Sequence, residues 1–135
     1  MTRGGFADAG WRLSVRRSDV FAFLQEERVA ADFVVANLFL HHFADADLVR
    51  LLRHTALLAP HFVACEPRRS PLALTGSRLL FAIGCNDVSR HDAVASVRAG
   101  FSGNELSRLW PENKGWTIHE APAWPFTHAF AASRV

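Results

Sequence analysis

One stretch of the chain decides its fold: Ala31-Asp32-Phe33-Val34-Val35-Ala36-Asn37-Leu38-Phe39-Leu40-His41-His42-Phe43. Its first half is a short apolar run, and its second half ends in polar side chains. An apolar run of about four to eight residues without alternation is typical of a strand covered on both faces, as in α/β sheets. Ligands of such sheets bind outside the carboxyl ends of the strands. The stretch therefore predicts a buried parallel strand over 33–38 that delivers Asn37, His41 and His42 to a functional site.

Hydrophobic periodicity and capping residues predict the other elements outward from this strand. Before the central strand, we expect a half-exposed strand over 11–17 and a short helix over 20–27 capped at Ser18-Asp19. After it, we expect a helix from Asp45 or Asp47 to about Pro60, a strand over 61–66 and a helix from Ser70-Pro71 to about 84. The segment from 86 is expected to be irregular at its start, with a short helical stretch capped at His91-Asp92; a helix from a Ser102–Glu105 capping box through 110 and strands over 116–121 and 126–133 follow. Alternating strands and helices predict a mostly parallel sheet, and the short link 122–125 makes the last two strands an antiparallel hairpin with one reversed strand.

The composition excludes several classes of function. The chain has 135 residues, the length of about one domain. It has 15 basic against 13 acidic residues, and its arginines are scattered along the chain, so its composition gives little support for nucleic-acid binding. Cys65 and Cys85 are the only cysteines, and they form no metal-ligand spacing with histidine, which favours a reducing cytoplasm and no metal site. No apolar run approaches the roughly 18 residues of a membrane span. We expect a cytoplasmic protein, bacterial by its Ala/Arg-rich usage, with no membrane or nucleic-acid partner.

Four segments in this order resemble the C-terminal portion of a class I S-adenosylmethionine-dependent methyltransferase, over nearly the whole chain. They are Ser18-Asp19-Val20, which follows the third strand of that family; Asn37 to Phe43, its fourth-strand motif; Glu66-Pro67-Arg68-Arg69, the end of its fifth strand; and Ser89 to Phe101, a run like that of small bacterial members. The resemblance implies a Rossmann-like α/β fold, S-adenosylmethionine as cofactor and a small, partly apolar acceptor.

The resemblance also implies roles for single residues. Asp19 and Val20 would contact the adenine, and Asn37 and Leu38 would form the wall beneath the methionine end of the cofactor. For a hydroxyl acceptor, whichever of the adjacent histidines His41 and His42 faces the pocket would remove the proton, since imidazole titrates near neutral pH. The other histidine would pack or cap the loop. Asp19 as a plain helix cap, and Asn37 as a partner of a neighbouring loop, are equally open.

Further polar residues have two interpretations each. Glu66 lines the pocket or forms a salt bridge to Arg68 or Arg98. Arg68 and Arg69 recognise an acidic acceptor or remain a solvated pair. His91 and Asp92 serve as base or acceptor contact, or Asp92 simply caps a helix.

The chain departs from the family in lacking the first strand, the glycine-rich turn and the acidic end of the second strand. We therefore expect residues 1–135 to form a single truncated domain with an incomplete cofactor site. Without the first strand, the strand over 33–38 becomes an exposed apolar edge that favours pairing. We expect a homo-oligomer, with the edge closed by a second copy, by strand exchange or by an N-terminal piece. A non-catalytic binding or oligomerisation module is the alternative function.

Overall fold

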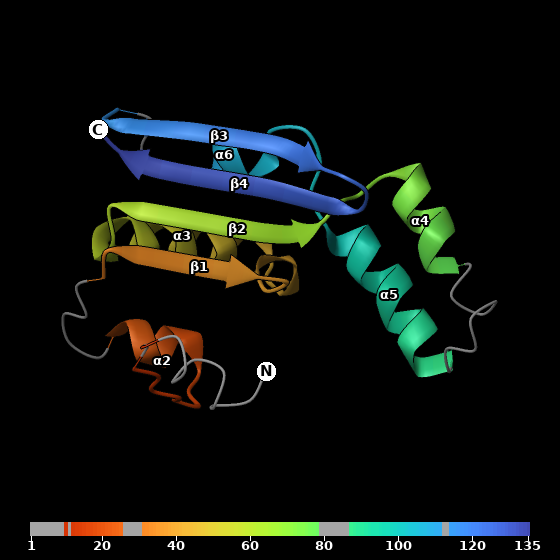
Figure 1. Cartoon of the computed structure of the whole chain (residues 1–135), viewed down its shortest axis with the longest axis horizontal. Helices are drawn as coiled ribbons and strands as arrows, with labels where there is room; N and C mark the ends of the chain where they lie inside the picture. The colour runs from red at the N-terminus through yellow and green to blue at the C-terminus, as the bar shows by residue number, and fades with distance from the viewer. Residues whose placement is uncertain (1–9, 11, 26–30, 79–86, 112–113) are drawn as a thin grey trace.

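A single four-stranded sheet organises the molecule, in a computed structural model that describes residues 10, 12–25, 31–78, 87–111 and 114–135. Its strands are β1 (Phe33–Asn37), β2 (His61–Pro67), β3 (Trp116–Ala123) and β4 (Thr127–Arg134), in the spatial order β1-β2-β4-β3 (Figure 1). β1 and β2 are parallel, and β4 runs antiparallel to both β2 and β3. The predicted α/β fold, with one reversed strand and a terminal hairpin, is confirmed.

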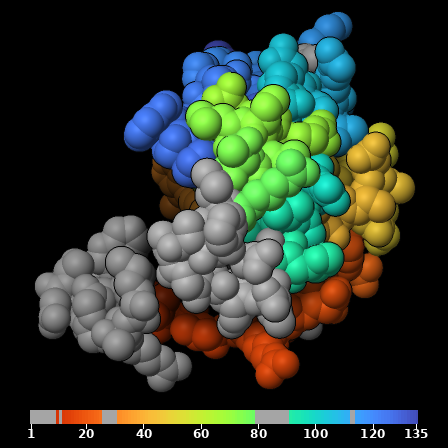
Figure 2. All heavy atoms as spheres, turned by 90° about the vertical axis from the view of Figure 1, so that its right-hand side faces the viewer, coloured from red at the N-terminus to blue at the C-terminus, as the bar shows by residue number. Residues whose placement is uncertain are grey.

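Helices cover one face of this sheet and one end of it. They are α2 (Val20–Gln25), the 3₁₀ turn η1 (Leu40–His42), α3 (Asp45–Leu58), α4 (Pro71–Arg78), α5 (Asp87–Ala99) and α6 (Glu105–Leu109). In Figure 1, α3 and α6 lie behind the sheet, α2 lies beyond the edge of β1, and α4 and α5 lie beyond the carboxyl end of β2. Figure 2 looks onto that end, where α4 lies between the β3–β4 hairpin and α5.

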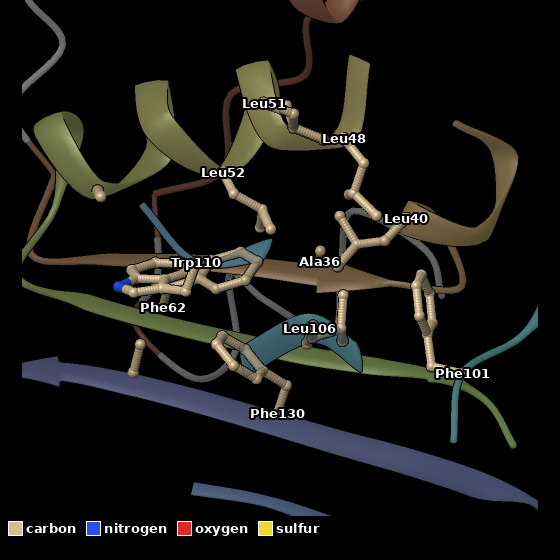
Figure 3. Close-up of a cluster of buried hydrophobic side chains, with 13 residues drawn as sticks. Ala36, Leu40, Leu48, Leu51, Leu52, Phe62, Phe101, Leu106, Trp110 and Phe130 are labelled. Carbon is tan, nitrogen blue, oxygen red and sulfur yellow. The ribbon is translucent and has the colours of Figure 1, made fainter. Parts of the chain in front are cut away.

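The core lies between the sheet and the α3–α6 layer (Figure 3). Because side chains alternate between the two faces of a strand, Phe62 of β2 and Phe130 of β4 point to the same side. The indole of Trp110, which follows α6, stacks on the ring of Phe62 at a centroid distance of 5.5 Å. Leu52 of α3 and Leu106 of α6 close the cluster, and both are fully buried. The inward positions of the strands therefore form one continuous core with the two helices.

The opposite face of the sheet carries no helix among the described residues, and it faces the viewer in Figure 1. Phe33 and Val35 of β1 lie on it and are 63% and 68% exposed. The prediction that 33–38 is a strand covered on both faces is therefore wrong. An apolar run cannot show whether a second helical layer is present, since that layer comes from other parts of a fold.

The predicted strand over 11–17 is also wrong. Residues 12–19 form neither helix nor strand, and Leu13 and Val15 are 46% and 66% exposed; Trp11 lies outside the described residues. Alternation of apolar and polar residues produces a strand only where a neighbouring strand supplies hydrogen bonds. β1, which ends the sheet, does not pair with this segment.

Two predicted helix caps differ from the structure. The N-cap of α3 is Ala44, which makes no side-chain bond, while Asp45 and Asp47 lie in the first turn, where a negative charge favours the helix dipole. α5 runs unbroken over 87–99, so His91-Asp92 lies inside a helix and caps nothing.

Two other caps agree wholly or in part. The Ser70 hydroxyl accepts the N–H of Ala73 at 3.1 Å, so the predicted cap of α4 is confirmed, although the predicted end near 84 lies outside the described residues. The capping box at α6 is half correct. Glu105 accepts the N–H of Ser102 at 3.0 Å, but Asn104 is the N-cap residue.

Candidate functional site

A buried carboxylate organises the carboxyl end of β1. Glu66 is fully buried near the end of β2 and accepts the backbone N–H groups of Phe39 and Leu40, each at 2.9 Å. Its Oε2 lies 2.7 Å from Nδ1 of His41. The predicted salt bridge of Glu66 to an arginine is wrong, because its partners are a histidine and the backbone of the loop after β1, and its role in lining a substrate pocket stays a prediction.

The loop leaves β1 through a strained residue. Leu38 has a φ of 51°, in the left-handed region that side chains other than glycine rarely adopt. Its N–H donates to the carbonyl of Cys65 at 2.9 Å, and Glu66 holds the next two N–H groups. Such a conformation costs about 1–3 kcal/mol and persists where neighbouring contacts enforce it. The loop is thus fixed by Cys65 and Glu66 of β2.

The adjacent histidines have different surroundings. The side chain of His41 is almost completely buried against Glu66, whereas His42 is exposed, with ring centroids 4.1 Å apart. A carboxylate only accepts hydrogen bonds, so His41 carries a proton on Nδ1 and Nε2 is left as the acceptor in the neutral ring. No hydrogen bond to that Nε2 occurs within the described part of the chain. His41 is thus the more buried of the two histidines, and which of them faces a pocket stays a prediction.

A largely apolar cavity of about 380 Å³, here called the β1 slot, runs between β1, α2 and α3. Its walls are Val20, Phe23 and Leu24 of α2, Val34 to Asn37 of β1 with Phe39, Leu40 and Phe62, and Leu51, Thr55 and Leu58 of α3. A second, more open hollow of about 630 Å³ shares Val20, Phe23 and Phe39 with it and also touches Ser14, Arg16 and Ser18. Two of the four predicted cofactor residues, Val20 and Asn37, thus lie on one cavity.

The other two predicted cofactor residues do not line the slot. Oδ1 of Asp19 accepts the N–H groups of Phe21 and Ala22 at 2.9 and 3.0 Å, which confirms its helix cap. Leu38 is exposed at the end of β1. Contact of either residue with a cofactor stays a prediction.

The remaining predicted residues lie apart from His41. His91 and Asp92 are exposed on α5, and His91 precedes the last residue of that helix, Ala99, by about 12 Å of helical rise. The end of α5, not this part, lines a cavity together with Phe43.

The two arginines after β2 have separate surroundings. Arg68 is partly buried, and its N–H donates to the carbonyl of Phe126 at 2.7 Å. Arg69 is exposed and forms an ion pair with Glu105, and contact of either arginine with an acidic acceptor stays a prediction.

A second buried Glu–His pair was missed by the sequence analysis. Oε1 of Glu120 on β3 lies 2.7 Å from Nε2 of His128 on β4. The Glu120 carboxylate also accepts the N–H groups of Leu106 and Ser107 at 3.1 and 2.8 Å and the hydroxyl of Ser107. Burial alone would raise the pKa of Glu120, but the bonds from His128, Ser107 and Leu106 outweigh it and lower the pKa below 4.5. Glu120 thereby fixes the start of α6.

Among the described residues, no group of three or more His, Cys, Asp or Glu side chains is placed to hold a metal ion. In the same part of the chain, no helix is long and apolar enough to cross a membrane.

Comparison with known proteins shows a similarity of fold to solved structures. No family model and no curated protein matches the chain. Among solved structures, it is similar to an O-methyltransferase family protein from Burkholderia thailandensis (TM-score 0.60, 17% identity, 94% of this chain and 37% of that one). It is also similar to the pyocyanin biosynthetic protein PhzM (0.59, 20%, 98% and 39%) and to the mitomycin 7-O-methyltransferase MmcR (0.58, 17%, 98% and 38%). The chain spans less than half the length of each. The protein therefore has the fold of the C-terminal portion of class I methyltransferases.

Proposed function

We propose that this protein takes part in S-adenosylmethionine-dependent methyl transfer to a hydroxyl of a small, partly apolar acceptor, once a complete site is assembled. The observation that carries the proposal is His41, held through Nδ1 by the buried Glu66 at the carboxyl end of β1. The O-methyltransferase family protein and MmcR, which share the fold, support the choice of reaction.

The described residues fit one end of the proposed cofactor. Asn37 and Phe39, at the carboxyl end of β1, offer an amide and apolar surface against which an adenine and the adjoining part of the cofactor would lie, outside the β1 slot. Val20 adjoins Phe39 on the second, more open hollow. The glycine-rich turn and the second acidic residue, which would hold the methionine and ribose, are not found in the 135 residues. The fit is therefore partial, and the remaining contacts have to come from polypeptide beyond this sequence or from another chain.

The chain's own contribution to the reaction is a positioned base. A bound sulfonium cofactor supplies an electrophilic methyl group. As the acceptor oxygen bonds to that methyl and the methyl–sulfur bond breaks to leave a neutral thioether, Nε2 of His41 would take the hydroxyl proton, and the Glu66 carboxylate would stabilise the resulting imidazolium. The base thus has an orienting partner, which the exposed His42 lacks in the described structure. Arg68, which follows β2, would meet an acidic group of the acceptor.

A second candidate function is a non-catalytic binding or oligomerisation module. The bare sheet face and the free edge of β1 favour it, because parallel strands are ordinarily covered on both faces. We propose a homo-oligomer in the bacterial cytoplasm that associates through β1 in either case. Cofactor binding separates the two functions.

Calorimetric titration with S-adenosylhomocysteine tests the proposal on the assembled protein. We expect saturable binding that Val20→Asp and Asn37→Ala weaken about tenfold or more, with Thr117→Ala on the far strand β3 as a neutral control. Absence of binding at about millimolar ligand, a Kd equivalent to only about −4 kcal/mol, would leave the module as the function.

Long-range ¹⁵N NMR of the histidine rings tests the base independently of turnover. We expect neutral His41 as the Nδ1–H tautomer, and a mixture of tautomers in Glu66→Gln, with His42 unchanged in both proteins. An Nε2–H tautomer of His41 in the parent protein would remove it as the base.

A further inference from the structure

On the open edge of β1, main-chain groups have no strand partners among the described residues. The N–H of Leu38 donates to the carbonyl of Cys65, and in a parallel pair the residues that face the partner strand alternate. Val34, Ala36 and Leu38 therefore face β2. The N–H and C=O groups of the alternate residues, at positions 33, 35 and 37, point to the open edge.

The β1 slot lies against this edge. Val20, Phe23 and Leu24 of α2 form its far wall, and α3 adds Leu51 and Leu58. Neighbouring strands lie about 4.8 Å apart, so a strand paired with β1 would occupy the slot under α2. The complete sheet of another molecule could not pair with β1 in the same way, because α2 would block its approach. The occupant that fits is therefore a single extended segment with apolar side chains on the side of α2 and α3.

Residues 12–17 have the required pattern. Leu13 and Val15 alternate with Arg12, Ser14 and Arg16, and the two apolar side chains are largely exposed. As a strand in the slot, the segment would pack the side chains of Leu13 and Val15 against α2 and α3. Its polar side chains would lie on the face of the sheet that carries no helix. Charged residues on an edge strand also prevent further pairing.

The segment of the same chain does not fill the slot. None of residues 12–18 lines it, although Phe23 of its far wall lies 5.5 Å from the guanidinium of Arg16. Only Ser18 and Asp19 separate the segment from α2, and Asp19 is engaged as the cap of that helix. A short connection that must turn sharply favours exchange of an element between two copies over closure within one.

We propose that two copies exchange residues 12–17, each inserting this segment as a parallel strand between β1 and α2 of the other. This inference rests on the self-association proposed above and is independent of methyl transfer. Its readout is molecular mass, so its failure leaves the cofactor titration unaffected.

Sedimentation equilibrium of the full chain at about 1–100 µM tests the exchange, because interfaces of standard size reach micromolar affinity or better. We expect a dimer. The donor variant Leu13→Asp/Val15→Asp raises its dissociation constant about 100-fold or more, since two apolar side chains can no longer be buried. Ser14→Asp, on the polar side of the same segment, is the matched control and leaves the dimer intact.

The acceptor variant is Val35→Pro, which removes an N–H on the open edge and leaves the bonds to β2 in place. We expect a monomer with the melting temperature of the dissociated parent protein. If the proline lowers that temperature, Phe23→Glu on the slot wall replaces it as the acceptor variant.

Mixing the donor and acceptor variants gives the decisive result. Each is monomeric alone, but the intact segment of one fits the intact slot of the other, so we expect a heterodimer. No dimer from the parent chain would overturn the proposal. Loss of the dimer in the acceptor variant alone would indicate direct pairing of two β1 edges, and a lower melting temperature of a monomeric donor variant would indicate insertion within one chain. Both results contradict exchange.

Discussion

Glu66 of β2 and His128 of β4 lie directly opposite each other in the antiparallel register, and each belongs to a different buried Glu–His pair. His41–Glu66 and His128–Glu120 therefore adjoin on the covered face of the sheet. Each glutamate also accepts N–H groups of a short helical segment, η1 for Glu66 and α6 for Glu120. This end of the sheet is thus held by buried Glu–His hydrogen bonds as well as by apolar packing.

Replacement of Glu66 should be costly. Glu66→Ala leaves His41 and the N–H groups of Phe39 and Leu40 buried without their acceptor, and we expect the free energy of unfolding to fall by about 3–5 kcal/mol in urea denaturation. Glu105→Ala is the matched control, because the pair of Glu105 with Arg69 is partly exposed and such pairs contribute about 0–1 kcal/mol. Equal losses in the two variants would contradict a special role for the buried carboxylate.

The Glu120 pair predicts a dependence of stability on acid pH. The pKa of Glu120 is lowered in the folded state below its ordinary 4.5, so the folded protein binds this proton less readily than the unfolded chain. The stabilisation is fully present above pH 4.5 and is lost as the pH falls through the folded pKa. Urea denaturation at successive pH values should show a difference between the parent protein and Glu120→Gln that is constant above this range and shrinks below it. If the difference in unfolding free energy between the two proteins grew on acidification, the pKa of Glu120 would be raised in the folded state and not lowered.

Leu38→Gly should stabilise the protein, because glycine adopts a φ of 51° without steric conflict and the Leu38 side chain buries little surface. The entropy that glycine loses on folding offsets part of the relieved strain, so the expected gain is at most about 1 kcal/mol. Val35→Gly, an equally exposed position with strand geometry, should instead lose about 1 kcal/mol. Thermal and urea unfolding of both variants check the contrast, which would vanish if Leu38 were unstrained.

Gly100 tolerates no side chain. A Cβ there would lie 2.1 Å from the carbonyl oxygen of Pro67, a backbone atom at the end of β2 that Phe101 also binds. We expect Gly100→Ala to cost about 3 kcal/mol or to shift the end of β2. Gly76→Ala serves for comparison, because its Cβ would meet only the exposed ring of Phe126 at 3.3 Å, and its stability should change by less than about 1 kcal/mol. Circular dichroism melts compare the two.

The local elements could be predicted from the sequence because their signals are local. The apolar run of β1, the Ser70-Pro71 start of α4 and the short link of the β3–β4 hairpin each depend on a few neighbouring residues. The exposure of Phe33 and the irregular conformation of residues 12–17 could not be predicted, since both depend on contacts between segments that are distant in the sequence. The segment from 86 was expected to be irregular at its start because it is polar, and helical only from His91-Asp92, yet α5 is one helix from Asp87 to Ala99 packed beside α4.

The location of the candidate site was predicted from the sequence, but the hydrogen-bond partners of its residues were not. Asn37 and His41 lie where the strand pattern placed them, but the partner of Glu66 was sought among nearby arginines and is a histidine 25 residues away. Glu120 and His128 did carry a signal. Glu120 continues the inward series of Trp116 and Ile118, and His128 precedes Phe130 and Ala132 in another. Polar residues at inward positions have to find each other in the core.

The position of β4 has a consequence for how the chain folds. β1, α3 and β2 are consecutive, as are β3 and β4, so each half of the sheet assembles from nearby residues. The two halves meet along one seam, the seven register pairs of β2 and β4, and His61 reaches Ser133 across 72 residues. Closing that long loop is the slow step that we expect for this topology, because distant contacts form only after its entropy cost is met. Glu66 and His128 face each other across this seam, so the two buried Glu–His pairs come together only when the halves of the sheet join.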